Sequence, residues 1–137
     1  MALKRMDNVG IVVEDLDATI EFFRELGLEL EGRAMVEGEW AGRVTGLGDQ
    51  RVEIAMMRTP DGHSRLELSR FLAPRVVADH RNAPVNALGY LRVMFAVDDI
   101  DETLARSASA ARSWSATKWS GTKTHIGSAT SADLEDF

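Results

Sequence analysis

Apolar residues near the start of the chain follow two periods, one typical of a strand and one typical of a helix. Residues 9–13 form a short run of mostly Val and Ile, which is typical of a strand. The next apolar residues recur every three or four positions and make one helical stripe: Leu16, Ile20, Phe23 and Leu26. Asp15 precedes the stripe as a predicted N-cap, and Gly27 follows it where a left-handed residue can end a helix. The pattern predicts a helix from about Asp15 to Leu26.

Three further strands are predicted after this helix. They cover residues 28–36, 51–58 and 64–71, and apolar side chains alternate along the last two. Residues 59–62, Thr-Pro-Asp-Gly, have the composition of a hairpin turn between those two strands. The Gly-rich residues 37–48 are predicted to be irregular. The first 72 residues therefore contain a module of strand, helix, strand, strand, strand.

The opening of this module is repeated later in the chain. Residues 8–20 return as residues 92–104, and seven of the thirteen aligned pairs are identical or exchange Leu for Ile. Asp99 takes the place of Asp15 and is the predicted N-cap of a second helix. A repeated strand and helix start predicts two copies of one module packed together, with residues 73–88 as the linker between them.

The composition changes abruptly at Ala105. Residues 1–104 contain eleven Val, and residues 105–137 contain none and are rich in Ser, Ala and Thr. Such a composition predicts a disordered C-terminus, because it buries too little apolar area to offset the entropy of ordering. Another interpretation is a frameshift near Ala105. A GC-rich gene read one base out of register would continue the helix after Leu104, end it at a Gly and supply two strands and a Gly-Pro-Gly turn.

Overall composition limits the classes of function. With 137 residues, of which 45% are apolar, the chain suffices for one domain with a core. Its net charge of −6 argues against nucleic-acid and membrane partners, and no apolar run has the length of a membrane span. There is no Cys, so any metal would be held by His, Glu, Asp or water. We expect a cytoplasmic protein.

The two module openings, V-G-I-V-V-E-D-L-D-A and F-A-V-D-D-I-D-E-T-L, resemble the vicinal oxygen chelate superfamily, which includes glyoxalases, bleomycin resistance proteins and extradiol dioxygenases. The resemblance implies an α+β fold in which paired βαβββ modules form a curled, barrel-like mixed sheet. Residues 5–72 would be the first module and residues 89–137 the second, abnormal after residue 104, within a single domain. The resemblance also implies a ligand cleft between the modules and a homodimer.

The resemblance singles out positions on the first and last strands of each module. Asn8 and Arg92 stand where the family often has His, and Glu67 matches an acidic metal ligand. Glu67 alternates with Leu66 and Leu68, so it is either a solvated strand residue or part of the ligand cleft. Arg92 lies in an apolar run and needs an anion beside it, which could be Glu67 or a substrate.

Trp40, in the Gly-rich segment, could cover a bound ligand or fill the core, and we favour the core.

Two functions remain open at this point. One is a divalent-metal-dependent lyase, isomerase or dioxygenase, in which Glu67 is a metal ligand or the catalytic group that moves a proton. The other is a protein that binds a small molecule without chemistry, through Asn8, Glu67, Arg92 and Trp40. Asn is a poor transition-metal ligand and Arg is a permanent cation, so the ligand set is depleted. We therefore favour binding without a complete metal site; no cofactor is expected, although a divalent metal remains possible.

Overall fold

The structure is a computed structural model that describes residues 2–80, 83–84, 86–89, 91 and 93–115. The chain divides into two compact units, Met1–Val77 and Ala78–Phe137, and each is described by itself.

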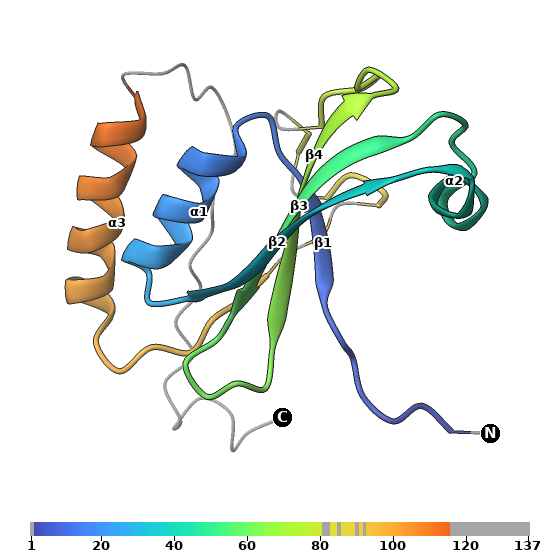
Figure 1. Cartoon of the computed structure of the whole chain (residues 1–137). Helices are drawn as coiled ribbons and strands as arrows, with labels where there is room; N and C mark the ends of the chain where they lie inside the picture. Colours follow the sequence, from blue (N-terminus) through green and yellow to red (C-terminus); the bar gives the residue numbers. More distant parts are fainter. Residues whose placement is uncertain (1, 81–82, 85, 90, 92, 116–137) are drawn as a thin grey trace. The chain divides into compact units, whose positions relative to one another are not determined.

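The first unit contains one mixed sheet and two helices (Figure 1). In chain order its elements are β1 (Val9–Val12), α1 (Leu16–Glu25), β2 (Glu29–Glu37), α2 (Glu39–Thr45), β3 (Arg51–Arg58) and β4 (Arg65–Ala73). The four strands lie in the order β1-β4-β3-β2, with β1 parallel to β4 and the other neighbours antiparallel. The α+β class is confirmed, and the predicted strand, helix and three strands occur in that order, with α2 between β2 and β3.

Helix α1 begins and ends where the sequence predicts. The Asp15 carboxylate accepts a hydrogen bond from the Ala18 backbone N–H at 2.9 Å, which satisfies one of the free donors of the first turn. Leu26 is the C-cap, and Gly27 follows with a φ of 104°, a conformation that costs glycine little. The helix is therefore bounded by its own capping chemistry.

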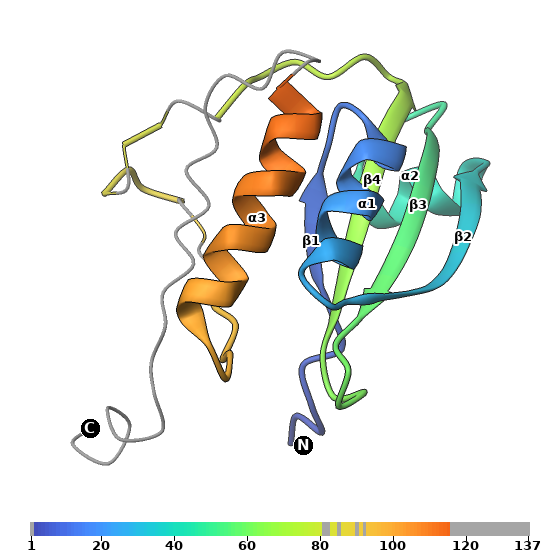
Figure 2. The same ribbon diagram turned by 90° about the vertical axis from the view of Figure 1, so that its left-hand side faces the viewer.

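The core lies between α1 and one face of the sheet, as Figure 2 shows. The helix contributes Leu16, Ile20 and Phe23, and the sheet contributes Ala55, Met57, Leu66 and Leu68; all are buried. In a strand, alternate side chains point to opposite faces, so burial of Leu66 and Leu68 sends Glu67 to the other face. The packing of α1 thus decides which strand residues are available for function.

The connection between β2 and β3 is more regular than predicted. Residues 37–48 were expected to be irregular, but they contain the two-turn helix α2, whose buried residue is Ala41. Trp40 lies on this helix with 58% of its surface exposed, so the expectation that it fills the core is wrong. A helix of seven residues has room to bury only a narrow face, and the small side chain of Ala41 occupies it.

The second unit contains the helix α3 (Ile100–Ser115). Asp99 caps it as Asp15 caps α1: its carboxylate accepts from the Glu102 N–H at 2.9 Å, and its carbonyl accepts from the Thr103 hydroxyl at 2.7 Å. The helix predicted to follow Asp99 is confirmed. The predicted strand before it is wrong for residues 93–97, which are not in a strand. A strand needs a neighbour to pair with, and the sequence after Ala105 lacks the alternation of further strands.

Helix α3 continues through the composition break. The prediction of disorder from Ala105 onward is wrong for residues 105–115, which are helical. Ala is the best helix former, and the segment is rich in it, so a helix started at the Asp99 cap can propagate. The frameshift hypothesis also continues this helix, so it stays a prediction, and residues 116–137 lie outside the described residues. None of the described helices combines the length and apolar character needed to cross a membrane.

The core assignment predicts a large loss of stability for Leu68→Ala. Leu68 is 0% exposed, so the truncation should lower the free energy of unfolding by about 2–5 kcal/mol through lost burial and a residual cavity. Leu72→Ala is the matched control on the same strand. Because Leu72 is 40% exposed, its truncation should lower the free energy of unfolding much less. Urea unfolding followed by circular dichroism measures both, and equal losses would contradict the assigned core.

Candidate functional site

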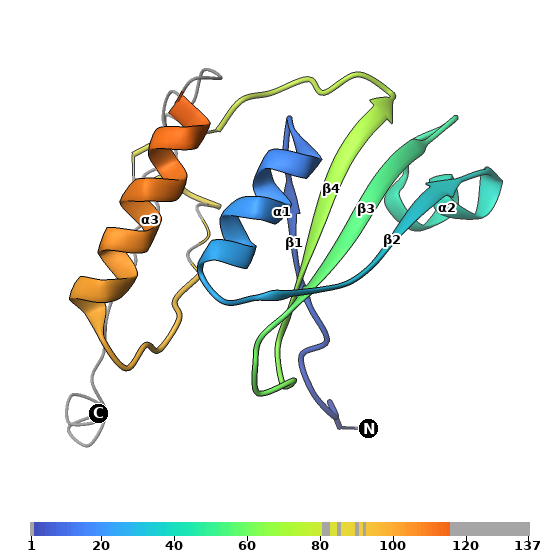
Figure 3. The same cartoon turned by 60° about the vertical axis from the view of Figure 1, so that its left-hand side comes forward.

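Alternate residues of the four strands form the face of the sheet opposite α1, which we call the open face. Figure 3 shows the curved sheet with α1 packed on one side of it, and the open face is the side away from α1. Strand register places its residues in rows, which read from β1 to β2 as Gly10, Glu67, Met56 and Gly32, then Val12, Ser69, Ile54 and Ala34. Glu67 is the one carboxylate in these two rows, and most of its neighbours are small or apolar.

Glu67 lies on β4, between Gly10 on the neighbouring strand β1 and Met56 on the neighbouring strand β3. A Cβ at Gly10 would meet nothing within 4 Å, so the space beside Glu67 is open on that side. The Ser69 hydroxyl, two residues further along β4, donates a hydrogen bond to Glu67 Oε1 at 3.3 Å. The carboxylate is half-buried, and no residue in the described part of the chain donates to its other oxygen, Oε2.

The other predicted site residues divide into three cases. Asn8 directly precedes β1 and is half-buried, and strand alternation places it on the same face as Gly10. The structure thus brings Asn8 and Glu67 to one face of the sheet. Trp40 lies on α2 and belongs to neither row of the open face. Arg92 lies outside the described residues.

Sequence reasoning missed an ion pair at the hairpin end of this face. Arg65 stands two residues before Glu67 on β4 and donates to the Glu31 carboxylate through Nε at 2.7 Å and Nη2 at 3.1 Å. The hydrogen bond from Arg65 lowers the pKa of Glu31, and the same bond raises the pKa of Arg65. Alternation along β4 could have placed Arg65 on the face of Glu67. The partner Glu31 could not be found, because it lies at the register shift between Leu30 and Gly32.

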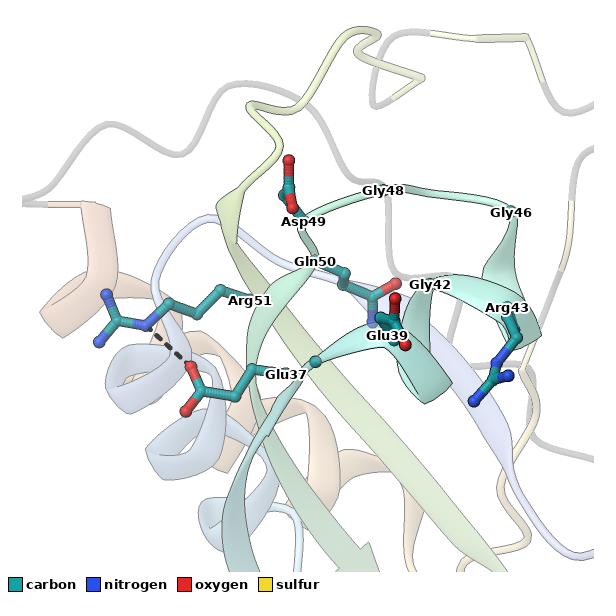
Figure 4. A pocket seen from close by; sticks show the side chains of 10 residues that line it. Glu37, Glu39, Gly42, Arg43, Gly46, Gly48, Asp49, Gln50 and Arg51 are labelled. Atoms are coloured by element: carbon teal, nitrogen blue, oxygen red, sulfur yellow. Dashed lines mark ion pairs between the residues drawn. The ribbon is translucent and has the colours of Figure 1, made fainter.

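A separate hollow of about 840 Å³ lies beside α2 (Figure 4). Residues of the β2–β3 connection line it: Glu37, Gly38, Glu39, Gly42, Arg43, Gly46, Gly48, Asp49, Gln50 and Arg51. Some of its polar groups already have partners, since Arg51 pairs with Glu37 at 3.4 Å and Gln50 accepts a hydrogen bond from the Thr45 hydroxyl outside the lining. None of the predicted site residues lines this hollow. We therefore take the open face as the candidate site.

The donors of the open face do not fit a transition-metal centre. Within the part of the chain that the structure describes, no three His, Cys, Asp or Glu side chains gather closely enough to hold a metal ion. Near the middle of the face stand one carboxylate, Glu67, and the amide of Asn8. An amide is a weak ligand for such metals, and the Ser69 hydroxyl is engaged with Glu67.

The mixed four-stranded sheet, with α1 packed against one face and Glu67 near the middle of the other, defines a small α+β protein. The sequence model of the glyoxalase/bleomycin resistance protein/dioxygenase superfamily matches residues 7–126. The chain belongs to this superfamily. It is similar to the crystal structure of a glyoxalase family protein from Bacillus cereus, with 75% identity and a TM-score of 0.75, over 77% of this chain and 71% of that one.

A more distant solved structure supports the fold alone. The protein SMU.1112c is 18% identical, with a TM-score of 0.52, over 80% of this chain and 77% of its own. A search of curated proteins found no match. The comparisons thus establish the superfamily.

The Arg65–Glu31 pair gives a testable titration. Because the lowered pKa of Glu31 depends first on Arg65, Arg65→Gln should raise that pKa toward the ordinary value of 4.5. The pair therefore stabilises the fold at pH values above the ordinary pKa of Glu31, and this contribution is lost as the pH falls through the lowered pKa. NMR titration of the Glu31 side-chain carboxyl measures the shift. Arg70→Gln is the control, since Arg70 pairs with Glu53 instead; an equal rise in that variant would contradict the assignment.

Proposed function

We propose that the chain binds a small organic molecule on the open face, with Glu67 as the central polar contact and without a complete metal site. The position of Glu67 carries the proposal. It is a half-buried carboxylate among Gly10, Met56 and Ile54, with open space on the Gly10 side. Sites for small molecules combine apolar surface with a few placed polar groups, and these two rows have that character.

Glu67 would act as a hydrogen-bond acceptor toward the ligand. The Ser69 hydroxyl holds Oε1, so Oε2 is the atom that would accept a hydroxyl or ammonium proton of the ligand. In a catalytic protein the same oxygen could take up and return a proton, which is general acid–base chemistry. Asn8 would add an amide to the same face, and the exposed ring of Trp40 would offer apolar contact.

Arg92 is proposed as a further contact that grips an anionic or carbonyl group by paired hydrogen bonds. Arg92→Ala should then abolish binding of a ligand that carries such a group.

Membership of the superfamily also supports a second candidate function, a divalent-metal-dependent lyase, isomerase or dioxygenase, in which Glu67 is proposed as the acidic metal ligand. Dependence of binding on a metal separates the two candidates.

A homodimer is proposed as well. Several large apolar side chains of the first unit are exposed, among them Val12, Trp40 and Val44 at 59%, 58% and 78%. Apolar surface of this kind favours association, which would remove it from water. Sedimentation velocity should show a dimer, and a monomer at high protein concentration would contradict this proposal.

Filling the space beside Glu67 should block binding and leave the fold intact. A Cβ at position 10 would meet no atom within 4 Å, and Val suits a strand. Gly10→Val should therefore leave the free energy of unfolding unchanged or raise it by about 0.5–1 kcal/mol. Gly48→Val is the matched control, because it fills the hollow beside α2 instead. The probes are bleomycin, a catechol and a 2-hydroxy acid, with binding measured by calorimetry. We expect binding to be lost in Gly10→Val and kept in Gly48→Val. Loss of binding in Gly48→Val alone would contradict the proposed site.

The same titrations after dialysis against a chelator test the metal question. Binding that persists in the metal-free protein is the expected result. Binding that disappears with the chelator, returns with zinc, nickel or iron, and is absent in Glu67→Gln would favour the metal-dependent enzyme.

A further inference from the structure

Arg65 reaches across the open face. It lies on β4 and its partner Glu31 lies on β2, and these strands are not neighbours, because β3 lies between them. The ion pair therefore spans β3, and the guanidinium lies over the sheet and not beyond its edge. Its side chain is 27% exposed, less than that of any other ion-paired Arg in the described part of the chain.

Only part of the guanidinium is used by this pair. Nε and Nη2 donate to the two oxygens of Glu31, which fixes the plane of the group. Nη1 has no hydrogen-bond partner among the described residues. Arg65 thus combines a fixed orientation with free N–H donors, an arrangement that suits a carboxylate or carbonyl oxygen. Asp7 acts electrostatically on both members of the pair, and its own carboxylate pairs with Arg5 at 2.9 Å.

Arg65 and Glu67 together define a donor and an acceptor on one strand. Residues two apart on a strand lie on the same face about 7 Å apart. Arg65 offers positive N–H donors and Glu67 offers the carboxylate oxygen Oε2. Between Glu67 and β2, Met56 supplies apolar surface, whereas Arg58, which pairs with Glu29, lies between Arg65 and β2. A ligand that satisfies both ends carries an anionic oxygen at one end and a hydroxyl or ammonium donor at the other, on a small apolar body.

We propose that Arg65, held by Glu31, is the anion-binding residue of the open face, and that the ligands of this site are small hydroxy acids or amino acids. This inference rests on the proposed binding function and adds the chemical class of the ligand.

The test uses three matched probes on the full chain. Mandelate carries a carboxylate, a hydroxyl and a ring; phenylacetate lacks the hydroxyl; and 1-phenyl-1,2-ethanediol lacks the carboxylate. Millimolar titrations are followed by NMR at the Arg Nε–H signals. The expected result is a saturable shift at Arg65 with both acids and none at Arg70, an ion-paired Arg of the same strand on the opposite face.

Variants then separate the two contacts. A hydrogen bond to a charged group contributes enough for Arg65→Gln to weaken mandelate binding by about tenfold or more. The same variant should leave binding of the diol unchanged, whereas Gly10→Val should weaken both probes. Arg70→Gln is the control and should change neither affinity.

Two failures can be distinguished. If Gly10→Val weakens the diol but Arg65→Gln changes no affinity, the open face binds ligands and Arg65 is only a structural ion pair, so the inference is overturned alone. If mandelate shifts Arg65 and Gly10→Val changes no affinity, anions bind Arg65 outside the proposed site, and the proposed function fails with the inference. The absence of any saturable shift at Arg65 would also overturn the inference.

Discussion

Burial of one apolar stripe of α1 against the sheet is the constraint on which the first unit depends. The stripe needs an apolar surface wide enough to cover it, and β3 and β4 supply this surface through Ala55, Met57, Leu66 and Leu68. A shift of either strand by one residue would place these side chains on the wrong face. The register of the sheet is therefore specified by the helix that covers it.

The same constraint creates the candidate site. Because side chains alternate, residues between the core positions must face away from α1, whatever their chemistry. Glu67 lies between Leu66 and Leu68, both of which are buried, and Ser69 and Arg65 follow the same alternation. The core thus holds the polar groups of the open face in position without contacting a ligand. Packing and binding are divided between two sides of the same strands.

Periodicity predicted most of the first unit, because local rules decide it. The Asp15 cap, the apolar stripe of α1 and the alternation in β3 each act within a few residues of the chain. Features that depend on distant partners were not predictable in this way. Glu31 meets Arg65 only because of the register shift in β2, and Trp40 is exposed because α2 buries Ala41 instead. The strand pattern of residues 93–97 was misleading, since an apolar run shows capacity for pairing and not the presence of a partner.

The pairing of β1 with β4 has a consequence for the order of folding. Val9 and Leu66 are partners in adjacent parallel strands although they lie 57 positions apart in the chain. Closing so long a loop is entropically costly, whereas β3 and β4 are joined by a short turn and can pair early. During synthesis β1 leaves the ribosome first but must wait for β4, the last strand of the sheet, before it can pair. Until then, the strand that borders Glu67 is an unpaired segment of the nascent chain.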